Sequence, residues 1–170
     1  MDSVKLDSLA LTYAFWILRL WLGLRALLSG LEKFSAKISV QQPLLDSKGV
    51  PDPSGAVVEV QQKVYGFSHY QAVSDTLQDK LANEPLLPAF LTTPFYMLLG
   101  YVLIALGVAL LLGVRTREAL LGMGIVYAML TFGLILIGQD QGVAWLGVHV
   151  LLIVAALVLL PFNRWSLTRP

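Results

Sequence analysis

The chain has 170 residues, of which 56% are hydrophobic and 14% charged, with a mean hydropathy of +0.71 and a formal net charge of +1. Because soluble domains carry about a quarter charged residues, this composition predicts a membrane protein, and the small net charge gives no reason to expect a nucleic-acid partner. The chain has no cysteine and two histidines, which excludes disulfides, thiolate nucleophiles and Cys-ligated clusters and argues against a metal site.

Four stretches have the roughly 20 mostly apolar residues that a membrane-spanning helix needs. They cover about residues 9–31, 94–114, 118–138 and 142–162. The second and third are joined by the short segment RTR, which requires an antiparallel hairpin. We therefore predict an all-α membrane protein, a four-transmembrane-helix bundle that forms a single membrane domain over residues 1–170, with a long extracytoplasmic loop between helices 1 and 2.

Local signals predict where three of these helices begin. Thr93 and Pro94 provide a hydroxyl N-cap followed by a proline at the first helical position, where proline is well tolerated. Thr116 is a candidate cap for the third helix, and Asp140 is a candidate cap for the fourth.

The outer loop, residues 32–93, has structure of its own in this interpretation. Residues 44–60 combine Gly, Pro and Asp turn signals with an alternating run that looks extended. Residues 69–83 place Tyr70, Val73, Leu77 and Leu81 at helical spacing, which predicts an amphipathic helix capped by Ser68.

Basic residues near the helix ends predict the orientation. The N-terminal tail, the turn between the second and third spans and the C-terminal tail share one side. They concentrate basic residues in short stretches, namely Lys5, Arg115, Arg117, Arg164 and Arg169. Lysines on the opposite side are spread over the long loop. By the positive-inside rule, both termini face the cytoplasm.

Arg19 and Arg25 lie inside the first apolar stretch, where a charge is costly and normally faces protein with a partner. At 100° per residue, Arg19 shares a stripe with Gly23, Ala26 and Gly30, small residues that let a neighbouring helix approach closely. We expect both arginines to be buried, and each could simply pin helices together through backbone carbonyls.

Arg25 shares its face with Ser29 and Glu32. With the predicted orientation, Arg25, Ser29, Tyr101 and His149 fall in one layer of the outer leaflet, which would suit carbonyl oxygens or an anion. These four are candidate ligand-binding residues, although His149 alone is more often a packed, hydrogen-bonded histidine. Arg19, Glu32 and Lys33 are structural or ligand candidates, and the last two favour an interfacial ion pair over a catalytic dyad.

Several motifs in order resemble the DoxX/DoxD-like family of small four-helix membrane proteins. They are RLWLGLRALLSGLEKF in the first span, LGVALLLGVRTREALLGM around the second and third, the histidine of the fourth, and NRWSLTR at the tail. The resemblance covers the spans and leaves out the loop of about 60 residues. Thr168 stands where the family often has Asp, and the second helix lacks an acidic residue that some members carry.

The resemblance implies a bacterial-type inner (cytoplasmic) membrane location and, by position, functional roles for Arg19, Arg25, Lys33 and His149. Members resembling DoxD are associated with thiosulfate:quinone oxidoreductase, which acts with a second subunit. A quinone is therefore a possible ligand, and other membrane subunits, a homo-oligomer and the lipid bilayer are the expected partners.

Two functions follow from these observations. The first is a small integral membrane subunit of a quinone-linked oxidoreductase assembly, inactive alone, with a quinone or oxyanion site in the outer half of the bundle. The alternative is a non-catalytic accessory or assembly subunit that packs against a larger membrane complex. A transporter-like or lipid-binding bundle is the least favoured, because no span is broken and none carries an intramembrane carboxylate.

Overall fold

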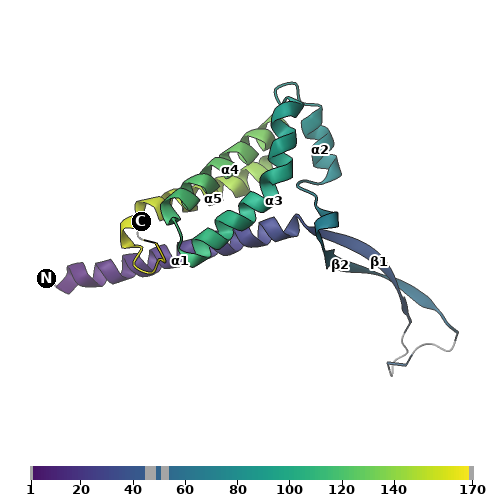
Figure 1. Ribbon diagram of the computed structural model, residues 1–170, viewed down its shortest axis with the longest axis horizontal. Helices are drawn as coiled ribbons and strands as arrows, with labels where there is room; N and C mark the ends of the chain where they lie inside the picture. Colours follow the sequence, from purple (N-terminus) through teal and green to yellow (C-terminus); the bar gives the residue numbers. More distant parts are fainter. Residues whose placement is uncertain (1, 45–48, 51–53, 169–170) are drawn as a thin grey trace. The chain divides into compact units, whose positions relative to one another are not determined.

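The computed structural model describes residues 2–44, 49–50 and 54–168, with only the backbone described for residues 2–7. Four of its helices are long and apolar enough to cross a membrane, as expected for a multi-pass protein in a lipid bilayer. These are α1 (Asp2–Glu32), α3 (Ala89–Leu112), α4 (Thr116–Leu136) and α5 (Asp140–Val158) (Figure 1). The four predicted spans are therefore confirmed, with shifted ends.

The start of α3 is also shifted, because the helix begins five residues before Pro94. Pro94 lies inside the helix rather than at its first position, so the predicted Thr93 cap is wrong. Pro88 precedes the helix instead, and its carbonyl accepts hydrogen bonds from the backbone N–H groups of Leu91 (2.9 Å) and Thr92 (3.3 Å). Because Pro88 fixes the chain direction there, the helix starts earlier than hydropathy indicated.

Thr116 and Asp140 are also not caps. Each is the first residue of its helix, after Arg115 and Gln139 respectively. Arg115 adopts a left-handed backbone conformation with φ 42°, which turns the chain sharply after α3. At the other end of α5, the helix stops at Val158, and the 3₁₀ turn η2 (Leu160–Phe162) follows with its proline.

The helices pack in the cyclic order α1, α3, α4, α5, so that α3 and α5 occupy opposite corners. The predicted small-residue stripe of α1 faces α3. A Cβ atom on Gly30 would lie 2.9 Å from the Gly100 carbonyl oxygen, and one on Gly107 would lie 2.5 Å from the Leu27 nitrogen. Such backbone contact is possible only for glycine, and it confirms the close approach expected from the stripe.

These contacts also fix how α1 is staggered along α3. Gly30 lies beside Gly100, Gly23 beside Gly107, and Arg19 beside Gly113, which follows the last residue of α3. Arg19 is therefore central in α1 but level with the α3–α4 turn. The part of α1 before Arg19 extends past that turn, as Figure 1 shows, and the rings of Tyr13 and Trp16 pack against Trp165 in the C-terminal segment.

Residues 33–71 form a second compact unit. It contains β1 (Ser35–Pro43) and β2 (Val57–Tyr65), which pair antiparallel from Ser35↔Tyr65 to Pro43↔Val57. The 3₁₀ turn η1 (Phe67–His69) follows, and the ring of Phe34 packs on those of Phe67 and Tyr70. The extended run predicted in 44–60 is partly β2 and partly outside the described residues, while β1 was not predicted.

The amphipathic helix predicted over 69–83 is shorter. It forms α2 (Asp75–Ala82), preceded by Ser74 rather than Ser68, and Tyr70 and Val73 lie outside it. Of the predicted apolar face, Leu81 is buried. The Leu81 side chain packs on α4, where a Cβ on Gly133 would lie 3.5 Å from it. The two residues before Ser74 are bends rather than helix, and the Ser74 side chain makes no capping hydrogen bond.

Candidate functional site

Arg19 is buried and bonded through one guanidinium nitrogen, while its Nε is buried and has no hydrogen-bond partner among the described residues. Its side chain is 4% exposed, and Nη1 donates to Oδ1 of Asn163 (2.9 Å) and to the backbone carbonyl of Trp165. Asn163 in turn donates from Nδ2 to Oγ1 of Thr116 (3.1 Å). The predicted burial of Arg19 is confirmed, and its hydrogen-bond partners lie in the C-terminal segment, where Asn163 links it to the start of α4.

The turn between α3 and α4 holds the same segment. The backbone N–H of Arg115 donates to the Thr168 hydroxyl (2.7 Å), and the Thr168 N–H donates to the Gly113 carbonyl (3.4 Å). Gly113 has φ +70°, and a Cβ there would lie 2.9 Å from Nη1 of Arg19. Arg19, the α3–α4 turn and the C-terminal segment therefore meet at one end of the bundle, as the predicted topology requires.

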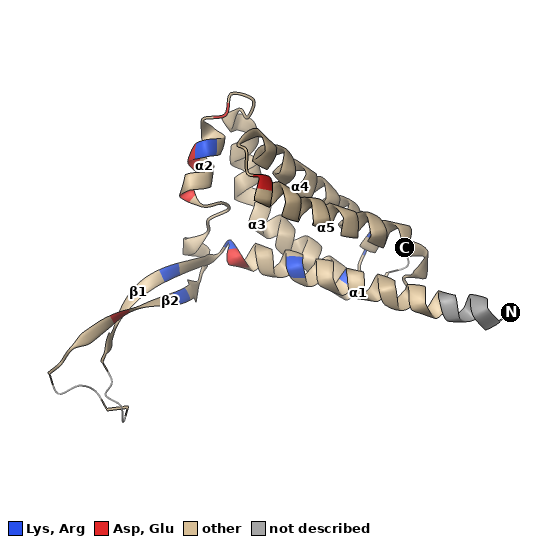
Figure 2. Ribbon diagram, turned by 180° about the vertical axis from the view of Figure 1, so that it is seen from behind, with Lys and Arg blue, Asp and Glu red and all other residues tan. Residues whose placement is uncertain are grey.

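Arg25 is placed differently. Its side chain is exposed along α1, so the expectation that both arginines are buried is not met within a single copy of the chain. Figure 2 shows basic bands within α1 and an acidic band at its C-terminal end. An exposed arginine on a membrane-spanning helix calls for a partner outside the chain or for snorkelling to the interface.

His149 lies in the centre of α5 and is 7% exposed. Its Nδ1 is 2.8 Å from the carbonyl oxygen of Trp145, one turn earlier. Because a carbonyl can only accept, Nδ1 carries the proton, and Nε2 of the neutral ring is an acceptor. Nε2 is buried and has no hydrogen-bond partner among the described residues, which is costly unless a donor reaches it.

Tyr127 completes the surroundings of His149. The two rings pack edge to face, with centroids 5.7 Å apart and planes at 83°, and Tyr127 is 4% exposed. Tyr127 and His149 are thus neighbours near the middle of α4 and α5. Tyr127 was not among the residues predicted from sequence.

The other predicted residues are more dispersed. Tyr101 is about half exposed on α3, the helix diagonal to α5, and Ser29 is half-buried beside the Gly30 contact. Glu32 is the exposed last residue of α1. Lys33 belongs to the second unit, where its carbonyl accepts from the backbone N–H of Gln71 (2.7 Å).

Within the described residues, no group of three or more His, Asp or Glu side chains is arranged to hold a metal ion. The chemistry available in the bundle is therefore that of an arginine, a phenol and an imidazole acceptor in apolar surroundings.

No family model, curated protein or solved structure matches the chain. The resemblance to the DoxX/DoxD-like family remains a prediction based on the motifs of the four spans.

Proposed function

We propose that the protein is a small integral membrane subunit of a quinone-linked oxidoreductase assembly, in which His149 and its neighbours bind a quinol or quinone headgroup. One observation carries the proposal: the buried, unpartnered acceptor at Nε2 of His149 in the middle of a membrane-spanning helix. A quinol hydroxyl is a hydrogen-bond donor that reaches this depth through the bilayer, and it would satisfy that acceptor.

The neighbours of His149 suit such a headgroup. Tyr127 supplies an aromatic surface and a hydroxyl that can bond a carbonyl oxygen. A neutral imidazole can accept a hydrogen bond at Nε2, and with it a proton, from a quinol hydroxyl. The oxidation of a quinol releases two protons and two electrons, and the chain has no cysteine to hold an iron–sulfur cluster. The electrons would pass to a redox centre on another subunit.

Binding of decylubiquinol to the purified full-length protein in nanodiscs tests this proposal. We expect His149→Leu to weaken binding at least about 10-fold, the loss of one well-made hydrogen bond in an apolar site. Tyr127→Phe should weaken it less. The matched control is Tyr101→Phe, which removes a hydroxyl from the diagonal helix and should leave binding unchanged. Equal effects of the two Tyr→Phe changes, or no binding by the wild type, would reject the site.

A second candidate, an accessory subunit that packs against a larger membrane complex, is favoured by Arg25. This side chain is exposed on the same helix as the exposed residues Trp21, Leu24 and Leu28. A carbonyl or carboxylate of a neighbouring protein would offset the cost of its charge in the membrane.

Purification from native membranes separates the two candidates. If the protein is an accessory subunit, Arg25→Leu should release co-purifying subunits while the protein stays folded, and no quinol binding should be measured. Arg115→Leu, an equally exposed arginine in the α3–α4 turn, serves as the control and should retain those subunits.

A further inference from the structure

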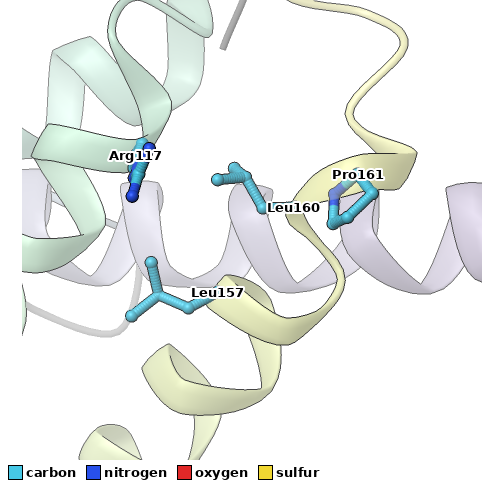
Figure 3. A pocket seen from close by; sticks show the side chains of 4 residues that line it. All are labelled: Arg117, Leu157, Leu160 and Pro161. Carbon is cyan, nitrogen blue, oxygen red and sulfur yellow. The ribbon is translucent and has the colours of Figure 1, made fainter.

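A pocket of about 430 Å³ opens where α4 begins and α5 ends, away from His149. Arg117 lines it from the first turn of α4, Leu157 from the last turn of α5, and Leu160 and Pro161 from η2. In Figure 3 the side chains of Arg117, Leu157 and Leu160 lie around the same space. The pocket therefore combines one cation with three apolar side chains.

This combination matches the boundary between headgroups and hydrocarbon. Helices α4 and α5 are both candidate membrane spans, so their adjoining ends lie where a bilayer changes from acyl chains to phosphates. Leu157 is on the span side of the pocket, and Arg117 is exposed at its polar edge. An arginine fork donates well to phosphate oxygens, while the leucines and the proline suit the glycerol backbone and the first methylenes.

The cation in this pocket is available for an anion. None of the four lining residues is acidic, and the Arg117 side chain forms no ion pair or hydrogen bond with another residue in the described part of the chain. Glu118, the next residue, is exposed and does not line the pocket. Arg115 and Arg164 are exposed in the neighbouring turn and tail, which makes this end of the bundle basic and attractive to anionic lipid.

We infer that this pocket binds the headgroup of an anionic phospholipid, with Arg117 on the phosphate and Leu157, Leu160 and Pro161 on the apolar part. A lipid headgroup and free phosphate both carry the anion that Arg117 would bind. Three of the four lining side chains are apolar, however, and would make no contribution to binding an inorganic ion. This site is separate from the proposed quinol site and does not depend on it.

The test is native mass spectrometry of the full-length protein with phosphatidylglycerol, phosphatidylcholine or inorganic phosphate. We expect the wild type to retain phosphatidylglycerol in preference to phosphatidylcholine, and Arg117→Gln to lower its affinity about five-fold, the effect of one arginine at a bilayer surface. Arg164→Gln is the matched control, because it removes the same charge from the same end outside the pocket, and it should have less than half that effect on the binding free energy.

A second variant addresses the apolar wall. Leu157→Trp fills the pocket while keeping Arg117, and it should also lower phosphatidylglycerol retention without changing the circular dichroism spectrum. Equal losses in Arg117→Gln and Arg164→Gln would reduce the effect to general surface charge and overturn the site. The site would also be overturned if the protein retained inorganic phosphate as strongly as phosphatidylglycerol. Equal retention of phosphatidylglycerol and phosphatidylcholine would overturn it too.

Discussion

Two arginines six residues apart on α1 have opposite surroundings. Arg19 is buried at the end of the bundle with Asn163 and the Trp165 carbonyl as partners, whereas Arg25 is exposed on the flank of α1. Both look alike in the sequence, as cations in an apolar run. The difference teaches that the stagger of a helix decides the role of its charges. Arg19 is level with a turn and a C-terminal segment that offer polar atoms, whereas Arg25 lies on an exposed flank.

The largest expected effect is therefore on stability and at Arg19. Arg19→Met leaves Oδ1 of Asn163 and the Trp165 carbonyl without their donor, and should lower the free energy of unfolding by about 3 kcal/mol. Arg25→Met, which removes the same charge from an exposed position, should change it by less than about 1 kcal/mol. Unfolding in mixed micelles, followed by circular dichroism, measures both. Similar losses in the two variants would contradict the contrast.

Next in size is the glycine contact that sets the stagger. Gly107→Ala puts a Cβ 2.5 Å from the Leu27 backbone nitrogen, which neither helix can accommodate without moving, and should destabilise the protein by about 2 kcal/mol. Gly147→Ala on α5 is the control, because a Cβ there meets no atom within 4 Å. The same unfolding assay measures both variants. An unchanged free energy of unfolding for Gly107→Ala would contradict the prediction, because it would mean that α1 and α3 can move apart at no cost in stability.

The smallest effect is at the tail. Thr168→Val removes the hydroxyl that accepts from the Arg115 N–H in an exposed bond, and should cost about 0.5–1 kcal/mol. Its clearest sign is faster hydrogen exchange at the Arg115 amide, with no change in α5. Thr131→Val, whose hydroxyl bonds the Tyr127 carbonyl within its own helix, should leave that amide as protected as in the wild type.

The spans could be predicted from sequence because length and hydropathy alone define them, and the Gly23, Ala26 and Gly30 stripe correctly indicated a close helix neighbour. The stagger of α1 against α3 could not be predicted, because hydropathy carries no information on the axial position of one helix relative to another. Depth was therefore assigned to Arg19 and Arg25 from their place in α1, which put Arg19 in mid-membrane instead of beside the α3–α4 turn.

The candidate site was predicted in part. His149 was identified from its type and place, but Tyr101 was assigned to its layer without knowledge that α3 and α5 are diagonal. A signal for Tyr127 was present: Tyr127 and His149 each lie 11 residues from Gly138, which has φ +66° in the α4–α5 turn. Residues equally far from the turn of an antiparallel hairpin meet, so counting outward from Gly138 would have paired them.

The bond between Arg19 and Asn163 has a consequence for biosynthesis. The two residues are 144 positions apart, so a ribosome adding about 5–20 residues per second needs at least several seconds to make the second after the first. During that interval the guanidinium of the emerging first helix has neither of its final acceptors. Insertion machinery, water or lipid phosphate must solvate the guanidinium meanwhile. The hydrogen bonds of Arg19 can form only after Asn163 and Trp165 have been synthesised.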